Sequence, residues 1–134
     1  MTRELEQFVW SRAGDLCEYC LLPQQWHPWR FEIDHIISQS HGGVTIAENL
    51  ALCCPKCNRH KGTNLSGFDF DTSAVTRLFT PRSDRWSDHF KWNFAILAGV
   101  TSIGRVTLAV LHINDAPRVA VRQALIDEGV FPAK

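Results

Sequence analysis

The chain has 134 residues, of which 45% are hydrophobic and 21% are charged, and this composition is typical of a folded protein rather than a disordered one. No apolar run reaches the roughly 18 residues of a membrane span, and the first residues lack the apolar segment of a signal peptide. We therefore expect a single cytoplasmic domain over residues 1–134, without membrane association. Because cytoplasmic thiols stay reduced, the five cysteines indicate metal ligands rather than disulfides.

The formal net charge is zero, with 14 basic and 14 acidic residues. This balance weighs against a protein that holds nucleic acid by a strongly basic surface. The charges are nevertheless unevenly distributed, since residues 1–34 carry three Lys/Arg against six Asp/Glu, and residues 75–134 carry eight against five. One basic side therefore remains compatible with the sequence, and catalysis on nucleic acid is not excluded.

Hydrophobic periodicity predicts a first helix over residues 3–13, which Gly14 ends. Apolar and acidic residues then alternate within the run RFEIDHII, residues 30–37, and favour a strand. His-Gly-Gly at 41–43 marks a turn, and residues 49–54 are expected to return alongside the strand.

A helix is expected from Pro55 to about Gly62, because proline suits the first helical position. Residues 64–88 are expected to form an extended connection packed by Phe68, Phe70 and Phe79. Residues 90–100 suggest a short hairpin.

Two helices are predicted at the end of the chain. Thr101 is expected to cap a helix that runs to about His112. The second helix is expected to begin after Asn114-Asp115, with Pro117 near its start and Gly129 past its end. Its predicted apolar face consists of Val119, Val121, Ala124, Leu125 and Ile126.

Two CxxC pairs are the strongest chemical signal, Cys17 with Cys20 and Cys54 with Cys57. Two thiolates at this spacing bind a tetrahedral zinc ion from a tight turn, and a second pair completes four-coordination. Such a shell leaves no open position, so we expect a structural zinc. The alternative of a redox pair lacks its βαβ context here. Cys53 stands one residue too early to join a pair and is expected to be a small buried apolar residue.

Asp34 and His35 lie between the cysteine pairs on the expected strand, and Asn58 follows the second pair. A zinc ion would hold the helix beside the strand, so Asp34 and Asn58 could supply two oxygen ligands to a hard divalent ion. A neutral His35 beside such an ion could deprotonate water. Strand alternation points His35 away from Asp34, so a shared site needs a twisted or bulged ribbon. Without the zinc frame, an Asp-His pair is usually only solvated surface.

The stretch from Cys17 to Gly62, CEYC…FEIDHIISQSHGGVTIAENLALCCPKCNRHKG, resembles the zinc-containing HNH endonucleases. Their pattern runs CxxC, Asp-His, a Gly-Gly turn, an Asn before the second strand, and CxxC followed by His or Asn. The resemblance implies an α+β fold, with a ββα-metal core and treble-clef-like zinc site over about residues 14–64. The helix at 3–13 and a mostly helical C-terminal extension over 65–134 would pack against this core.

The resemblance also implies roles for individual residues. His35 would be the general base that activates water. Asp34 and Asn58 would bind the catalytic ion. Asn49 would brace the loop between the strands so that His35 faces the phosphate. The implied cofactors are one structural zinc ion and one catalytic Mg²⁺ or Mn²⁺, and the implied substrate is DNA, with RNA left open.

Asn58 departs from the commonest family pattern, in which the final residue is His. An amide oxygen still binds a hard ion, and the Asn argues against a transition-metal preference. His60 is an alternative ligand, but two residues along a helix its side chain points roughly 200° around the axis. A surface or phosphate-contact role is therefore favoured for His60. Arg59 and Lys61 flank the site as candidate phosphate contacts or as charges on a solvated face.

The C-terminal half, from LFTPRSDRWSDHF onward, resembles the tail of many small bacterial HNH proteins. Its interleaved basic and aromatic side chains could clamp a nucleic-acid strand by charge and stacking. Packing of the aromatics onto the nuclease unit is the favoured alternative. The residues concerned are Arg82, Arg85, Trp86, His89 and Trp92.

These patterns predict a metal-dependent endonuclease that hydrolyses phosphodiester bonds in DNA. The rival hypothesis is a non-catalytic zinc-binding module that binds nucleic acid or protein with the same scaffold. Asp34, His35 and Asn58 favour the enzyme, because a binding module needs neither a base nor a carboxylate facing phosphate. Zero net charge weakly favours the module.

Overall fold

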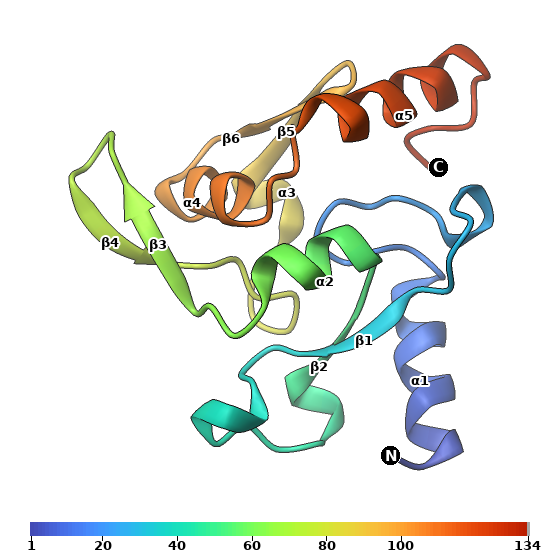
Figure 1. Cartoon of the computed structure of the whole chain (residues 1–134), viewed down its shortest axis with the longest axis vertical. Helices are drawn as coiled ribbons and strands as arrows, with labels where there is room; N and C mark the ends of the chain where they lie inside the picture. Colours follow the sequence, from blue (N-terminus) through green and yellow to red (C-terminus); the bar gives the residue numbers. More distant parts are fainter. Residues whose placement is uncertain (134) are drawn as a thin grey trace.

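The computed structural model describes residues 1–133. These residues form five α-helices and three separate two-stranded antiparallel sheets, so the mixed α and β fold class is confirmed (Figure 1). In chain order the elements are α1 (Arg3–Ala13), β1 (Glu32–His35), β2 (Leu50–Cys53), α2 (Pro55–Lys61), β3 (Ser66–Asp69), β4 (Ala74–Arg77), α3 (Trp86–His89), β5 (Phe90–Asn93), β6 (Ile96–Gly99), α4 (Ser102–Val110) and α5 (Ala116–Asp127). Within the described residues, no helix combines the length and the apolar character that crossing a membrane requires.

Helix α1 has the boundaries that the sequence predicts. The Thr2 hydroxyl accepts a hydrogen bond from a main-chain N–H of the first turn, and Gly14 ends the helix in the left-handed conformation at φ 62°. Near the C-terminal end, the Arg12 guanidinium donates to the carbonyl oxygens of Ala47 (2.9 Å) and Leu50 (2.8 Å). These bonds fasten α1 to the segment that leads into β2.

The β1–β2 hairpin and α2 also follow the sequence prediction. The antiparallel register pairs Glu32 with Cys53 and His35 with Leu50, and all four residues of β2 are buried. Pro55 occupies the first turn of α2. The Cys54 thiol caps this helix by accepting from the Cys57 N–H at 3.4 Å, so the turn between β2 and α2 is built around a cysteine.

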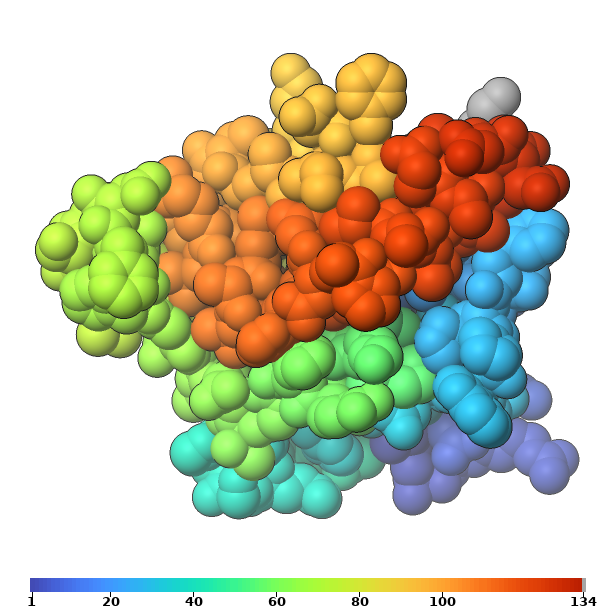
Figure 2. All heavy atoms as spheres, turned by 45° about the horizontal axis from the view of Figure 1, so that its top comes forward, coloured from blue at the N-terminus to red at the C-terminus, as the bar shows by residue number. Residues whose placement is uncertain are grey.

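The region after α2 differs from the predicted extended connection, because it contains the β3–β4 hairpin, which projects from one end of the molecule (Figures 1 and 2). Phe68 and Phe70 pack edge to face at 4.8 Å on this hairpin and remain exposed. Of the three predicted packing aromatics, only Phe79 lies in the core. Phe68 and Phe70 contact each other rather than the core, so their apolar character did not indicate burial.

The hairpin β3–β4 is anchored on α4 at two points. A Cβ on Gly67 would lie 2.8 Å from methyl groups of Val106 and Val110, so only glycine allows this approach. Beside it, the Arg105 guanidinium pairs with the buried Asp69 carboxylate at 3.0 Å, which lowers the pKa of Asp69 to about 2.

Residues 90–99 form the predicted hairpin, and Thr101 caps α4 by accepting from the Gly104 N–H at 3.1 Å. A Cβ on Gly104 would lie 2.2 Å from the carbonyl oxygen of His89. The absence of a side chain at Gly104 therefore lets α4 lie directly against the hairpin.

The structure bears out only part of the predicted apolar face of α5, because Leu125 packs against the core and Val119 and Ile126 are half-buried. Val121 is 47% exposed and Ala124 is also exposed. The most deeply buried side chains of this helix are those of Arg118 and Arg122. Arg122 donates to the carbonyl oxygens of Ala95 and Ile113, each at 2.9 Å. The two arginines turn inward because thiol and carbonyl acceptors lie beneath them.

Aromatic packing joins the C-terminal extension to the N-terminal half. Phe79 packs edge to face on Tyr19 (6.3 Å) and on Phe90 (5.4 Å). The Trp86 indole donates to the carbonyl oxygen of Tyr19 at 2.9 Å, and Arg82 pairs with Glu18. Further along, Trp92 packs on Phe131 and His89 bonds to Thr101. These contacts agree with the packing alternative for the tail aromatics.

Candidate metal centre and active site

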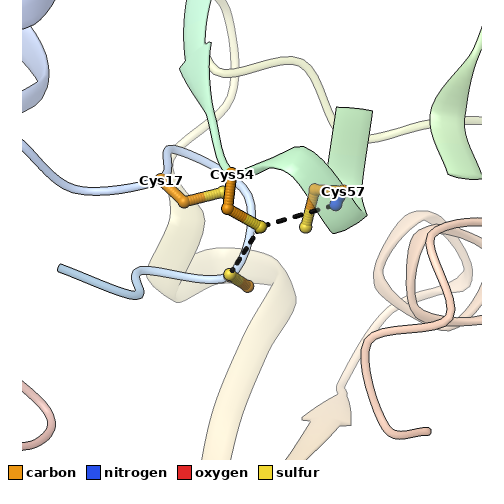
Figure 3. Close-up of side chains that lie close together, drawn as sticks. Cys17, Cys54 and Cys57 are labelled. Atoms are coloured by element: carbon orange, nitrogen blue, oxygen red, sulfur yellow. Dashed lines mark hydrogen bonds between the residues drawn. The ribbon is translucent and has the colours of Figure 1, made fainter. Parts of the chain in front are cut away.

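The four cysteines of the two CxxC pairs meet in one buried cluster. Their sulfur atoms all lie within 4.8 Å of one another, and the Sγ atoms of Cys20 and Cys54 are 3.8 Å apart. Figure 3 shows the side chains of Cys17, Cys54 and Cys57 directed toward one another. Cys17 belongs to the knuckle, the tight turn over residues 17–20, and the other two belong to the β2–α2 turn. A tetrahedral zinc ion with Zn–S bonds of about 2.3 Å separates its sulfur ligands by about 3.8 Å. The donor set and spacing therefore fit a structural zinc ion.

Backbone hydrogen bonds hold the first cysteine pair in place. The Leu21 N–H donates to the Cys17 carbonyl at 2.8 Å, and Leu21 adopts a positive φ of 63° to close the turn. Glu18, which follows Cys17, bonds twice to Leu52 of β2. Its N–H donates to the Leu52 carbonyl (2.9 Å), and its carboxylate accepts from the Leu52 N–H (2.8 Å). Cys53 is buried outside the cluster, with its thiol directed to the Cys54 carbonyl at 3.4 Å, as the sequence predicts.

Arg118 of α5 adds a positive charge to the cysteine cluster. Its guanidinium lies 2.9 Å from the Cys57 sulfur and 3.9 Å from the Cys54 sulfur, and it also donates to the Leu111 carbonyl at 2.7 Å. Burial acts to lower the pKa of Arg118, but the neighbouring thiolates outweigh burial and raise it. Four thiolates around Zn²⁺ leave roughly two net negative charges, so a buried arginine is a suitable counterion. Sequence reasoning missed this residue, because no local pattern links positions 57 and 118.

The Asp34 side chain is buried beneath Lys61. Its carboxylate accepts from the Tyr19 hydroxyl at 3.0 Å and pairs with the Lys61 ammonium at 3.1 Å. Lys61 also donates to the carbonyl oxygens of His35 (3.2 Å) and Ile36 (3.1 Å). Burial raises the pKa of Asp34, and the bonds to Lys61 and Tyr19 oppose this effect. Lys61 is only 2% exposed, which corrects the expectation of a phosphate contact or a solvated charge.

His35 and Asn49 meet in the loop between β1 and β2. The Asn49 side chain closes this loop with three bonds of 2.9 Å, accepting from the Ile37 N–H and donating to the carbonyls of Ile37 and Val44. This is the bracing geometry that the family resemblance implies for Asn49. The braced loop places the Thr45 hydroxyl 2.9 Å from Nε2 of the half-buried His35. Thr45 had no signal in the sequence, because its role depends on the path of the loop.

Asn58 lies beside Glu32 rather than beside Asp34. The Asn58 amide donates to the Glu32 carboxylate at 2.8 Å near the surface, and among residues 1–133 no hydrogen bond joins Asn58 to Asp34. Glu32 and Asp34 are two residues apart on β1 and share a face of the strand. Hard oxygen donors therefore gather on this face, with Asp34 buried and Glu32 and Asn58 accessible.

The two other candidate phosphate contacts on α2 have different surroundings. Arg59 is exposed. His60 stacks on His112 of the extension, with ring centroids 4.2 Å apart and an interplanar angle of 25°. His112 belongs to the turn between α4 and α5, so His60 contacts the extension. It does not take part in the contact between Glu32 and Asn58.

Comparison with known proteins places the cysteine pairs and the β1–β2–α2 unit in a segment with a known family likeness. Residues 17–64 match the family model described as HNH endonuclease. The chain is 26% identical over 116 residues to the Septu protein PtuB of Bacillus thuringiensis, an alignment that covers 85% of this chain and 42% of that protein. No solved structure matches the chain.

Residues 17–64 are thus similar to the HNH endonuclease family, which confirms the resemblance inferred from the sequence. This segment contains both cysteine pairs, His35, Asn49 and Asn58. The chain spans less than half the length of the relative, so the activity of that whole protein is not transferred by the alignment.

We predict one tightly held zinc ion per chain at the cysteine cluster. Cys54→Ser should lose the ion and unfold or aggregate, because binding energy at a structural site is folding energy. Cys53→Ala should keep both the zinc and the fold. Elemental analysis and thermal unfolding check both variants, and a cooperatively folded Cys54→Ser protein would show that the ligand set is different.

Arg118→Met should weaken zinc retention by about 10- to 100-fold, the usual effect of losing an outer contact to metal ligands. Arg122→Met is the matched control, because Arg122 is buried on the same helix but bonds to carbonyl oxygens. The measurement is the rate of zinc release to a chromogenic chelator, with unfolding followed in parallel. Equal zinc release from the two variants would contradict a specific role for Arg118 at the thiolates.

Proposed function

We propose that the protein is a metal-dependent endonuclease that hydrolyses phosphodiester bonds in DNA. The observation that carries the proposal is that Asn49 braces the loop that follows His35, within the segment that matches the HNH family. A zinc site alone would suit a binding module equally well. The braced, half-buried imidazole is the feature that a binding module does not need.

His35 acts as the general base in this proposal. When Nε2–H donates to the Thr45 hydroxyl, Nδ1 keeps its lone pair and can accept a proton from water. Thr45 is then a positioning residue that fixes the tautomer and the direction of the ring. The proton moves from the attacking water to Nδ1 as the water oxygen bonds to phosphorus and the 3′ oxygen leaves.

A divalent ion, Mg²⁺ or Mn²⁺, would be held by Asp34 and Asn58, as the family resemblance implies. Bound there, the ion would stabilise charge on the phosphate and on the leaving oxygen. The carboxylate and amide oxygens on this face suit a hard ion. Glu32 orients the Asn58 amide through its 2.8 Å contact.

Lys61 controls access to Asp34 in this arrangement. Its ammonium contacts both carboxylate oxygens of Asp34, at 3.3 and 3.1 Å. An ion bound at Asp34 would share these oxygens with the Lys61 ammonium, so the two positive charges compete for the carboxylate. The bonds from Lys61 to the carbonyls of His35 and Ile36 would keep the ammonium at the strand meanwhile.

We further propose that the HNH core, over about residues 14–64, works as one domain with the helix at 3–13 and the extension at 65–134. The contact between Arg118 and Cys57 and the bond from Trp86 to Tyr19 support this organisation. The alignment with PtuB supports it too, because its 116 residues extend well beyond the HNH segment.

We also propose a cytoplasmic location, because thiols that bind zinc must stay reduced.

Nicking of supercoiled plasmid DNA with Mg²⁺ or Mn²⁺ tests the nuclease. His35→Ala should reduce the cleavage rate by about 10²–10⁴-fold, the usual contribution of a general base, with an unchanged unfolding midpoint. Thr45→Val should give a smaller loss and a shifted pH profile, whereas Thr45→Ser should restore the parent profile. The control is His41→Ala, which alters an exposed histidine and should keep the parent rate.

Activity of His35→Ala within about tenfold of the parent would refute the base role. If the folded, zinc-loaded protein bound nucleic acid but cleaved neither DNA nor RNA with any divalent ion, the zinc-binding module would be the correct function.

Brief EDTA treatment should abolish cleavage while the structural zinc stays bound, and Mg²⁺ or Mn²⁺ should restore the rate. Asp34→Asn and Asn58→Ala should raise the metal concentration needed for half-maximal cleavage, and Glu32→Gln should raise it less. Cleavage is measured against added metal, with zinc counted in the same samples. Full activity in EDTA with zinc bound would contradict a second ion, and an effect confined to Glu32→Gln would identify Glu32 as the carboxylate ligand.

A further inference from the structure

Three metal-ligating side chains meet outside the HNH site, where the extension packs on α2. His60 belongs to α2, and His112 and Asp115 belong to the turn between α4 and α5. One ligand atom of each lies within 4.8 Å of the others. Figure 2 shows the segment from α4 into α5 lying against α2 at the surface of the molecule. The cluster therefore joins the HNH segment to the extension.

The distances in this cluster are close to those of a coordinated ion. His112 Nδ1 and Asp115 Oδ2 are 3.5 Å apart. A tetrahedral zinc ion with bonds of about 2.0–2.2 Å separates nitrogen and oxygen ligands by about 3.3 Å. His112 and Asp115 thus already have the required spacing. Only His60, whose ring stacks on His112 at 4.2 Å, must turn about its side-chain torsions to share an ion.

The backbone fixes two of the ligands before any ion binds. His112 adopts a left-handed conformation at φ 52°, which histidine tolerates better than most side chains. Arg118 donates to the carbonyls of Leu111 (2.7 Å) and His112 (3.2 Å), which holds this turn. Asp115 precedes α5 at the N-cap position, yet its carboxylate makes no capping bond. That carboxylate is therefore not committed to the helix.

We propose that His60, His112 and Asp115 form a second metal site for a borderline divalent ion such as Zn²⁺. Two imidazoles and one carboxylate are the ligand types that zinc and its neighbours prefer, whereas Mg²⁺ favours oxygen ligands alone. Three protein ligands leave one position for water. Because the ligands come from α2 and from the α4–α5 turn, the bound ion stabilises the docking of the extension on the HNH segment.

Calorimetric titration of the full chain with Zn²⁺ tests this site, starting from protein that holds one equivalent of zinc by elemental analysis. The parent should bind a second equivalent, and its unfolding midpoint should rise. Asp115→Asn and His112→Asn should each weaken this binding by about 100-fold or more, because outer contacts alone contribute about 10- to 100-fold. Asparagine at position 112 tolerates the left-handed backbone, so the turn keeps its shape. His41→Ala is the control and should bind as the parent does.

Co²⁺ added to the zinc-loaded protein separates the two metal sites. Binding at the imidazole and carboxylate cluster should give weak visible absorption without thiolate-to-metal charge transfer in the near ultraviolet. Charge transfer would show exchange into the cysteine cluster instead. Zinc stoichiometry that stays at one, or equal affinity in the parent and in His112→Asn, would overturn the proposal and leave only a stacked histidine pair.

Discussion

The structure depends on a buried cluster of four sulfur atoms that cannot be stable without positive charge. Thiolates at tetrahedral spacing around zinc leave roughly two net negative charges, and burying such charge without compensation is costly. The knuckle, the end of β2 and the start of α2 all converge on this cluster. The Cys54 sulfur also caps α2, so the helix that carries Asn58 and Lys61 begins at a cysteine of the cluster. The position of the candidate active site therefore follows from the geometry of the cysteine cluster.

The extension supplies a positive charge to this cluster, because Arg118 lies beside its sulfur atoms. Arg118 reaches the Cys57 sulfur from a helix 61 residues away, and Arg122 lies one turn later among main-chain carbonyls. Both guanidiniums are buried. A helix with two inward arginines would be unstable on an apolar core. It is stable here because its acceptors are thiolates and carbonyl groups supplied by distant segments.

Local signals were sufficient to predict much of the fold, and long-range contacts explain what they missed. The ends of α1 and α2 were predictable because Gly14 and Pro55 act on their own backbone. The cysteine quartet was predictable because each pair carries its own spacing. The buried face of α5 was predicted only in part, since periodicity finds Leu125 but cannot show that Arg118 meets a sulfur atom. Lys61 was taken for a surface charge for the same reason, because its partner, Asp34, lies 27 residues earlier.

The zero net charge of the chain describes its surface poorly, and this changes how DNA binding should be understood. Lys61 and Asp34 neutralise each other in the interior. Arg118 faces the cysteine cluster, whose charge the formal count omits, and Arg122 is buried among carbonyl oxygens. The surface therefore has no basic excess to attract DNA from a distance. Contact with a phosphate would depend on the few groups at the corner of β1 and α2, such as the exposed Arg59, and on the charge of a divalent ion there. Binding of substrate and binding of that ion would then be coupled, because the ion attracts the phosphate and the phosphate oxygens can bind the ion.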